Sequence, residues 1–385
     1  MSRTKVKPQI IISSYDDIEN PYYGGGGAIA IHAVAKRLTH DFNVTVLTGT
    51  FPGARDTITR NRVKYVRIGS ASVGAKMGQV AFTAQLPYYA RRMKHDLWIE
   101  SFTPPFSTSM LPLVTDKPVI GLVHMLAADD MRRKYGLPFH LVENTGLKWY
   151  RSFIVPSDTI YNRISALNTK AAIVRIPNGV SVPAPYKQPT QPNHFLFMGR
   201  IEVNQKGIDL MIEAYARAAA HTSLPLVIAG GGADSEVAAL KRLIAKHNLT
   251  NRVKLVGRVS GRRKEILMKN SAALLCPSRF ETFPLLALEA MAYKKCLVGF
   301  SIDGLTWIPD DCMMRVNGFS TASFAKKLVD ISQNPARAMA TGEQFSTLIA
   351  DYDWDATAQK YKEFITDTLT RASAVSRIWQ FGARS

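Results

Sequence analysis

The pattern that decides the fold is clearest in the stretch Leu274-Leu275-Cys276-Pro277-Ser278-Arg279-Phe280-Glu281-Thr282-Phe283-Pro284-Leu285-Leu286-Ala287-Leu288-Glu289-Ala290-Met291-Ala292. An apolar run typical of a buried strand ends at Cys276, and a polar loop follows it. A helix is predicted to start near Phe283, with Pro284 in its first turn, where proline is favoured. A strand, a loop and a helix in this order predict one βα unit of a parallel sheet.

The same rhythm runs along the rest of the chain. Short apolar runs alternate with helix-length segments, and Gly, Pro, Asn, Asp or Ser residues bound each run, which is typical of parallel sheets covered by helices on both faces. The rhythm stops near residue 190 and then restarts, so we predict two doubly wound α/β halves. The predicted strands are Gln9–Ser13, Asn43–Leu47, Val63–Ile68, Leu97–Ile99, Val119–Val123, Phe195–Met198, Leu226–Ala229, Val253–Val256, Ala272–Cys276 and Cys296–Phe300.

A proline-rich segment separates the two halves. Residues 183–192 contain four prolines and too few apolar residues for a core, which predicts an extended linker. The first domain is therefore expected over residues 1–182 and the second over residues 193–352.

The last segment is predicted to be an amphipathic helix over residues 353–385. Its apolar residues recur at helical spacing, and acidic residues stand at its start, where the helix dipole favours them. The triplet Asp351-Tyr352-Asp353 could instead hold a divalent metal, but the capping role explains it better. The apolar face comprises Trp354, Ala358, Tyr361, Ile365 and Leu369.

Composition limits the possible partners. The 385 residues carry a formal charge of +19 and a pI near 9.8, so nucleic acid, an acidic membrane face and phosphorylated small molecules are the candidate anions. With 46% hydrophobic residues the chain is not disordered, and its three cysteines form no metal-binding or disulfide pattern. No run is long enough to span a membrane. We expect a cytoplasmic protein, at most peripheral to a membrane.

Four glycines precede a helix in Tyr22-Tyr23-Gly24-Gly25-Gly26-Gly27-Ala28. Their missing Cβ atoms allow close approach of another molecule beside the positive end of the helix. A structural turn is the alternative. A dinucleotide site is disfavoured because about ten residues separate the strand from the glycines, whereas that fingerprint needs a tight turn.

Two further sets of polar residues follow strands of the second half. Arg200 and Lys206 follow the strand that ends at Met198, and cations at this edge of a parallel sheet suit a diphosphate, although they could also be ordinary surface charges. Glu281 lies in the loop before a helix, and Glu289 lies within its otherwise apolar sequence. A phosphate at the helix N-terminus, with carboxylates accepting from sugar hydroxyls, would use all these features.

In this order along the chain, the glycine turn, Gly199-Arg200 with Lys206-Gly207, Leu226–Gly232 and Glu281 with Glu289 resemble the family 4 retaining glycosyltransferases of GT-B fold. The resemblance implies two Rossmann-like domains facing a central cleft, with the helix 353–385 crossing back to complete the first domain. The chain departs from the family at Ser301–Trp307, where relatives usually have a small-residue loop followed by an acid.

The resemblance also implies residue roles. Arg200 and Lys206 would neutralise the diphosphate of a sugar donor, Glu281 would bind the sugar hydroxyls, and Glu289 would hold the ribose. His124, at the end of a predicted strand, would lie near the reacting centre. The other implied contacts are Gly25 and Gly26 with the phosphate from the first domain, the N–H groups of Phe283, Leu285 and Leu286 with phosphate, and Val259 and Lys264 with the base.

The predicted reaction is sugar transfer from a nucleoside diphosphate, linked to UDP or GDP, to an acceptor hydroxyl with retention of configuration. No cofactor and no metal are expected, and the acceptor is a lipid-linked or small molecule. A polyanion or nucleic-acid binder would leave both glutamates and the glycine turn without a role, so no nucleic acid partner is expected. An epimerase or phosphorylase with the same two-domain plan is the other alternative.

The segment from Met77 to His95 mixes apolar and basic residues. Such a segment could lie on an anionic membrane surface. Pro87 is expected to break the segment, and an ordinary helix before the strand at Leu97 would also explain its composition.

Overall fold

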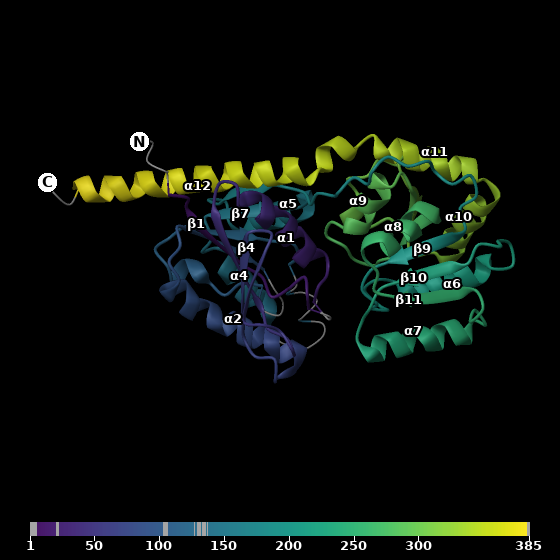
Figure 1. Cartoon of the computed structure of the whole chain (residues 1–385), viewed down its shortest axis with the longest axis horizontal. Coiled ribbons are helices and arrows are strands. Elements are labelled where there is room, and N and C mark those ends of the chain that lie inside the picture. The colour runs from purple at the N-terminus through teal and green to yellow at the C-terminus, as the bar shows by residue number, and fades with distance from the viewer. Residues whose placement is uncertain are drawn as a thin grey trace. The chain divides into compact units, whose positions relative to one another are not determined.

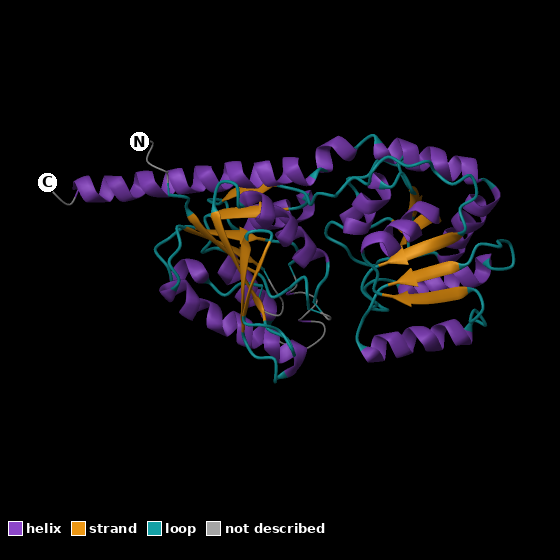
Figure 2. Ribbon diagram, in the orientation of Figure 1, coloured by secondary structure: helices purple, strands orange, loops and turns teal. Residues whose placement is uncertain are grey.

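The computed structural model describes residues 6–382, apart from residues 21–22, 103–106, 127, 129–131, 133–135 and 137 (Figure 1). The chain divides into two compact units, Met1–Asn178 with Trp354–Ser385, and Gly179–Asp353. Each unit has its own sheet with helices packed on it (Figure 2). The basic residues before position 6, Tyr22 of the glycine turn and the end of the predicted helix 353–385 lie outside the described residues.

The described part of the N-terminal unit contains an eight-stranded sheet in the order β3-β4-β2-β1-β5-β6-β7-β8. The neighbouring strands are parallel, except that β3 is antiparallel to β4. The strands are β1 (Gln9–Ser13), β2 (Asn43–Gly49), β3 (Thr57–Arg60), β4 (Val63–Ile68), β5 (Leu97–Ser101), β6 (Val119–Leu122), β7 (Ser152–Val155) and β8 (Ala172–Arg175).

Both faces of this sheet are buried. In β1, Ile10 and Ile12 belong to one apolar cluster and Ile11 to another, because successive residues of a strand point to opposite faces. Residues of α1 (Gly26–Leu38) and α12 (Trp354–Gly382) belong to the first cluster, and residues of α2 (Gly74–Arg92) and α5 (Asp158–Leu167) to the second. The shorter elements are η1 (Leu111–Leu113) and α4 (Phe139–Leu147).

Helix α2 corrects one prediction, since Pro87 does not break it. A proline inside a helix removes one backbone hydrogen bond and crowds the preceding turn. Here Phe82, Leu86 and Ala90 are buried at helical spacing on both sides of Pro87. Packing of this face compensates for the local loss.

Helix α12 packs against α1. Trp354, Tyr361 and Ile365 of the predicted apolar face of α12 lie in the same apolar cluster as Ile10 and Ile12 of β1. At the surface the Arg37 guanidinium pairs with Asp355, in the first turn of α12. Helix α12 therefore contributes core residues to the N-terminal unit although it is the last segment of the chain.

The described part of the C-terminal unit contains a six-stranded parallel sheet in the order β11-β10-β9-β12-β13-β14. The strands are β9 (His194–Met198), β10 (Leu226–Ala229), β11 (Val253–Gly257), β12 (Ser271–Cys276), β13 (Cys296–Phe300) and β14 (Met314–Val316). The helices are α6 (Ile208–Ala218), α7 (Asp234–Lys246), α8 (Gly261–Asn270), α9 (Leu285–Ala292), η2 (Asp303–Leu305), α10 (Thr321–Gln333), α11 (Pro335–Ser346) and η3 (Ile349–Tyr352).

The strand order of the C-terminal unit is the doubly wound order 3-2-1-4-5-6. The first strand of the unit, β9, lies between β10 and β12, so the chain winds first to one side of β9 and then to the other. The N-terminal unit repeats this arrangement around β1. The prediction of two doubly wound α/β halves is confirmed.

The predicted linker, residues 183–192, is attached to the C-terminal unit. The Tyr186 hydroxyl donates to the Tyr293 carbonyl over 2.6 Å, and the Lys295 ammonium donates to Gln188 Oε1 over 2.6 Å. Burial lowers the pKa of Lys295 to about 8. Residues 183–192 form no helix or strand, and side chains between their prolines bind the neighbouring core. The compact C-terminal unit begins at Gly179 and therefore includes the predicted linker.

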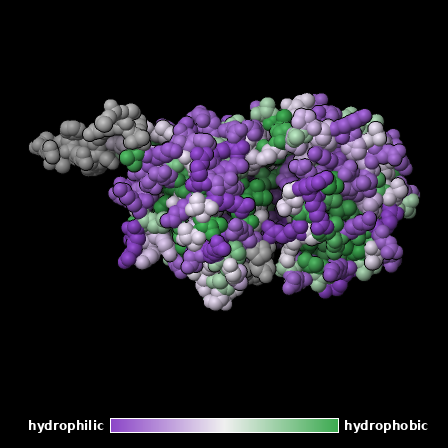
Figure 3. Space-filling view, viewed as in Figure 1, coloured by the Kyte–Doolittle hydropathy of each residue, from purple (hydrophilic) through white to green (hydrophobic). Residues whose placement is uncertain are grey.

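On the face drawn in Figure 3, hydrophilic residues form most of the surface of both units. None of the helices in the described ranges is long and apolar enough to cross a bilayer.

The packing of α12 can be tested by truncating one buried side chain. Ile365 is fully buried, and we expect Ile365→Ala to lower the free energy of unfolding by about 2–5 kcal/mol. Urea unfolding followed by circular dichroism measures the change. Thr366→Ala, at the exposed neighbouring position, is the control and should have little effect. Equal stability of the two variants would contradict the packing of α12 on the sheet.

Candidate functional site

The loops after β9 and β12 meet at the switch point of the C-terminal sheet. β9 and β12 are neighbours, but the helix that follows β9 leads to β10 on one side, whereas β12 leads to β13 on the other. Ligands of open α/β sheets bind at the carboxyl ends of strands at such a point. The predicted residues Arg200, Lys206 and Glu281 lie in these two loops.

A close backbone contact joins the two loops. Gly207 has a φ of +58°, and a Cβ atom there would lie 1.9 Å from the Pro277 carbonyl oxygen, so no larger residue fits. The Arg279 N–H donates to the Gln205 carbonyl over 2.9 Å, and the Arg279 guanidinium binds Asp209 Oδ2 over 2.7 Å. The loops therefore form one connected structure.

Lys206 and Glu281 form an ion pair across this contact. The Lys206 ammonium lies 2.6 Å from Glu281 Oε1, which also accepts from the Ser278 hydroxyl over 2.7 Å. Their side chains are 21% and 13% exposed. The pair is shielded by protein but still accessible to a ligand, which could take over either charge.

Arg200 lies at the same edge of the sheet with a different partner. Its guanidinium Nη2 is 2.9 Å from Glu202 Oε2, and its side chain is 48% exposed. Both predicted cations thus follow β9, but each pairs with its own glutamate.

The glycine run Gly230–Gly232 forms a third loop of the site, after β10. A Cβ atom on Gly230 would lie 1.8 Å from the Gly199 carbonyl oxygen, and one on Gly232 would lie 2.2 Å from that of Ile201. The Ile201 N–H donates to the Gly231 carbonyl over 2.9 Å. Glycines let this loop close against the start of the Arg200 loop.

Helix α9 begins later than predicted. Pro284 is its N-cap, with extended backbone, and the first helical residue is Leu285. The pyrrolidine ring fixes φ but leaves ψ free to be extended, so Pro284 ends the loop instead of joining the first turn. Leu285 and Leu286 open the helix, where backbone N–H groups lack intrahelical partners. Phe283 precedes the helix.

Glu289 and Lys264 form a second ion pair. The Lys264 ammonium lies 2.5 Å from Glu289 Oε1, with side chains 28% and 18% exposed. Lys264 belongs to α8 and Glu289 to α9, so this ion pair joins two helices that follow different strands of the sheet. Val259, in the turn between β11 and α8, is half-buried. The sequence placed these residues in one site but did not predict their pairing.

In the N-terminal unit, Gly25 is the N-cap of α1, and Gly26 is its first residue. A Cβ atom on Gly25 would have no neighbour within 4 Å, whereas one on Gly27 would lie 2.9 Å from Asp16 Oδ2. Internal packing therefore explains one glycine of the turn, and Gly25 borders open space.

His124 follows β6. Its Nε2 atom is buried and has no hydrogen-bond partner among the described residues. Burial lowers the pKa of His124 to about 4, so the imidazole is neutral at pH 7. The ring nitrogen is therefore neutral and buried, without a hydrogen bond from any of the described residues.

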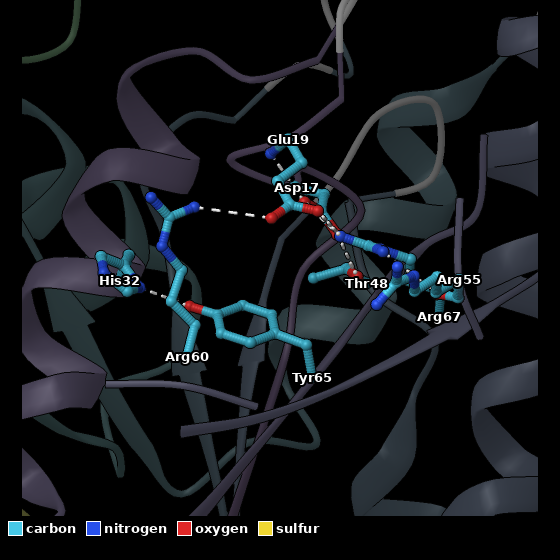
Figure 4. A network of polar contacts seen from close by, with 8 residues as sticks. All are labelled: Asp17, Glu19, His32, Thr48, Arg55, Arg60, Tyr65 and Arg67. Atoms are coloured by element: carbon cyan, nitrogen blue, oxygen red, sulfur yellow. Dashed lines mark hydrogen bonds and ion pairs between the residues drawn. The ribbon is translucent and has the colours of Figure 1, made fainter. Parts of the chain in front are cut away.

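A buried ion-pair network in the N-terminal unit was missed by the sequence analysis (Figure 4). Arg67 of β4 donates to Asp17 Oδ2 over 2.8 Å and to Glu19 Oε2 over 2.7 Å. The Thr48 hydroxyl also donates to Asp17 Oδ2, over 2.8 Å. The side chains of Arg67 and Asp17 are 2% and 1% exposed. This network fixes the segment that leads from β1 to the glycine turn.

A signal for this network was present in β4. Val63 and Tyr65 are buried, and Arg67 continues their side of the strand, so a charge at this position requires a buried partner. The sequence does not identify the partner, because Asp17 is fifty residues away.

No cluster of three or more His, Cys, Asp or Glu side chains that could hold a metal ion occurs within the described ranges. In the triplet Asp351-Tyr352-Asp353, the first two residues end η3, and Asp353 lies between η3 and α12. Cys276, Cys296 and Cys312 are free and buried.

Comparison with known proteins identifies both halves of the chain. Residues 24–182 match the family model "Glycosyltransferase Family 4", and residues 182–343 match "Glycosyl transferases group 1".

Curated relatives belong to the same class. The chain is 29% identical over 236 residues to a glycogen synthase of Mycobacterium tuberculosis, a match that covers 58% of this chain and 56% of that protein. It is 28% identical over 243 residues to a D-inositol 3-phosphate glycosyltransferase of Kineococcus radiotolerans, with coverage of 54% and 55%. The chain thus spans just over half the length of these relatives.

Solved structures share the fold. Sucrose-phosphate synthase from Thermosynechococcus elongatus superposes with a TM-score of 0.81 at 19% identity, over 95% of this chain and all of that one. Anabaena HepE in complex with UDP-glucose superposes with a TM-score of 0.74 at 14% identity, over 94% and 100%. Together with the matched family models and the two parallel-sheet domains, these findings show that the chain belongs to the group 1, family 4 glycosyltransferases of GT-B fold.

Proposed function

We propose that this glycosyltransferase moves a sugar from a nucleoside diphosphate to an acceptor hydroxyl with retention of anomeric configuration. The observation that carries the proposal is the Lys206–Glu281 ion pair beside the N-terminus of α9, at the switch point of the C-terminal sheet. This site offers a cation, a carboxylate and free backbone N–H groups, which match a phosphate joined to a sugar.

In the proposal, Arg200 and Lys206 bind the diphosphate of the donor. Each cation now pairs with a glutamate at the surface of the loop, so a phosphate group would replace a carboxylate as its partner. The N–H groups of Phe283, Leu285 and Leu286 would face the same phosphate at the positive end of α9. Charge on the diphosphate would then be neutralised without a metal ion.

The two glutamates are proposed to bind the neutral parts of the donor. Glu281, released from Lys206, would accept hydrogen bonds from sugar hydroxyls, and Glu289 would accept them from the ribose. The base would meet the backbone of Val259, with Lys264 beside it. The Lys264–Glu289 pair supports this assignment because it holds the Glu289 carboxylate in place.

Three residues of the N-terminal unit are proposed to bind ligands as well. The open space at Gly25 favours close approach of a phosphate to Gly25 and Gly26. His124 is neutral, and its Nε2 atom has no partner among the described residues; it is proposed to bind a hydroxyl near the reacting carbon.

The proposed reaction breaks the bond between the anomeric carbon and the diphosphate oxygen and forms a bond from that carbon to the acceptor oxygen. Positive charge develops on the sugar ring and negative charge on the leaving phosphate, which preorganised cations and helix N–H groups stabilise. The acceptor would attack from the face that the diphosphate leaves, and its proton would pass to the departing phosphate. Glu281 is engaged by Lys206 and Ser278, which disfavours its acting as a covalent nucleophile.

The names of several relatives and structural neighbours point to sugars or sugar phosphates as their acceptors. For this chain we propose an acceptor hydroxyl on a lipid-linked or small molecule. A role in glycolipid or cell-surface polysaccharide synthesis would suit such an acceptor. The buried free cysteines fit the reducing cytoplasm.

A panel of UDP- and GDP-sugars tests the donor class. Binding should raise the melting temperature, and slow hydrolysis of the matching donor should release the nucleoside diphosphate. An epimerase would convert the nucleotide sugar without releasing diphosphate. No stabilisation by any member and no turnover would reject the proposal and leave a polyanion binder as the alternative.

The residue roles predict the kinetics of two variants. Arg200→Ala and Glu281→Ala should each lower transfer roughly 10²–10³-fold, because both side chains are proposed to act mainly in the transition state. Initial rates with the donor selected by the panel measure the effect. Arg217→Ala, which removes an exposed cation on α6 paired with Glu213, should leave the rate nearly unchanged. Near-normal turnover of either site variant would reject its role.

Membrane association is proposed for the outer side of α2. Four apolar side chains of this surface are about half exposed: Val73 just before α2 (48%), Met77 (57%) and Tyr88 (53%) of α2, and Leu113 of η1 (52%). The short helix η1 contacts α2. Exposed Arg91 and Arg92 end the helix, and the Arg92 guanidinium lies 4.8 Å from the Tyr88 ring centroid.

Charge favours an anionic bilayer as the partner of this surface. The N-terminal unit has 28 of the 49 Lys and Arg residues and 15 of the 30 Asp and Glu residues, which gives it +13 of the formal charge of +19. Basic residues beside apolar ones bind anionic lipid headgroups.

Vesicle flotation tests this surface. The chain should float with anionic vesicles at low salt and less at high salt, because salt screens the attraction between the basic residues and the lipid headgroups. The double variant Met77→Ser with Tyr88→Ser should float less. Val182→Ser, at an equally exposed position of the C-terminal unit, should behave like the wild type. Absence of wild-type flotation with anionic vesicles would reject the membrane surface.

A further inference from the structure

An aromatic stack packs against the loop that carries Glu281 and includes one residue of that loop, Phe283. The rings of Phe283 and Trp307 are stacked, with centroids 4.9 Å apart and planes at 22°. Tyr352 contacts both, at centroid distances of 4.9 Å from Trp307 and 6.1 Å from Phe283. Phe345 lies 6.1 Å from Trp307 on a further side. The aromatic stack is thus Phe283, Trp307, Phe345 and Tyr352.

Trp307 also fixes the other end of the Glu281–Phe283 segment. Its indole N–H donates to the Gly304 carbonyl over 3.0 Å. A Cβ atom on Gly304 would lie 2.3 Å from the Glu281 carbonyl oxygen, so the two backbones are in close contact. Through its ring and its N–H, Trp307 therefore restrains the segment at Phe283 and at Glu281.

The stack also contacts the segments at the two ends of the C-terminal unit, near Val180 and Asp353. The Val180 N–H donates to the Tyr352 carbonyl over 2.7 Å, and Val180 pairs with Asp353 in a parallel bridge. Trp307 itself comes from the segment Ser301–Trp307, which contains η2. This segment contributes no residue to the proposed donor site.

We propose that Trp307 is a positioning residue that holds the Glu281 carboxylate in place. Through Tyr352, Trp307 also connects this position to the backbone pair of Val180 and Asp353. This inference rests on the proposed function, in which Glu281 binds the donor sugar. A displacement of about 1 Å at a positioned group can cost a reaction about 100-fold. Trp307 is well suited to prevent such a displacement because it stacks on Phe283 directly and restrains Glu281 through the Gly304 backbone.

Loss of Trp307 is expected to affect the binding of the sugar and of the nucleotide differently. Glu281 is assigned to the sugar, whereas Glu289 of α9, Val259 in the turn before α8 and Lys264 of α8 are assigned to the nucleoside. Loss of Trp307 should therefore weaken the handling of a nucleotide sugar far more than the binding of the free nucleoside diphosphate.

Two substitutions at Trp307 test this separation in the full-length chain. Trp307→Ala should lower kcat with the matching donor roughly 30- to 100-fold, while calorimetry with the free nucleoside diphosphate should show an affinity within about threefold of wild type. Trp307→Phe keeps a stacking ring but loses the hydrogen bond to Gly304, and we expect it to restore most of the rate. Phe319→Ala, which removes a ring that packs on Phe300 elsewhere in the unit, is the matched control for lost aromatic packing and should keep the wild-type rate.

Tyr352 gives an independent arm. Tyr352→Leu should reduce kcat in the same direction as Trp307→Ala, and Tyr352→Phe should match wild type because the ring makes the contacts. An unchanged rate in Trp307→Ala would overturn the proposal. Equal losses of turnover and nucleotide binding, with a lowered melting temperature, would also overturn it, because they indicate a purely structural role. A wild type that binds no nucleoside diphosphate would instead reject the proposed function, and this inference with it.

Discussion

The close approach of Gly207 to the Pro277 carbonyl is the constraint on which the candidate site depends. The two loops come from neighbouring strands, and the absence of a side chain at Gly207 lets their backbones meet. The ion pair of Lys206 with Glu281 and the pairing of Arg279 with Asp209 then follow from this contact. The same principle recurs at Gly230 against Gly199 and at Gly304 against Glu281, so backbone contacts at glycines connect the loops of the site.

The fold was predictable because both sheets, apart from the edge strand β3, are parallel with buried central strands. Runs such as Ile10–Ile12 and Leu226–Ala229 are apolar throughout, and helices follow them along the chain. The edge strand Thr57–Arg60 was not predicted, because it is short and mostly exposed and shows no apolar run. Pro87 was misjudged because local propensity was weighed without the buried face that holds α2 together.

The residues of the candidate site were also predictable by position, but their partners were not. Strand ends and the helix start at Leu285 bring Arg200, Lys206 and Glu281 to one edge, as the strand order requires. The pairing of Lys264 with Glu289 depends on how α8 packs against α9, which spacing along one helix does not reveal. The stacking of Trp307 on Phe283 joins segments about twenty residues apart through the η2 turn. Such contacts are set by tertiary packing, for which one sequence offers no pattern.

The glycine contacts have a thermodynamic consequence. Loops that are already joined through their backbones lose little conformational freedom when a ligand arrives, so most of the ordering entropy of binding belongs to the ligand itself. Phe283 and Pro284 are already buried, which leaves Phe280, 45% exposed, as the large apolar side chain still open to solvent between β12 and α9. Association at this site should therefore have a small heat-capacity change, dominated by the exchange of charged partners and not by folding of the loops.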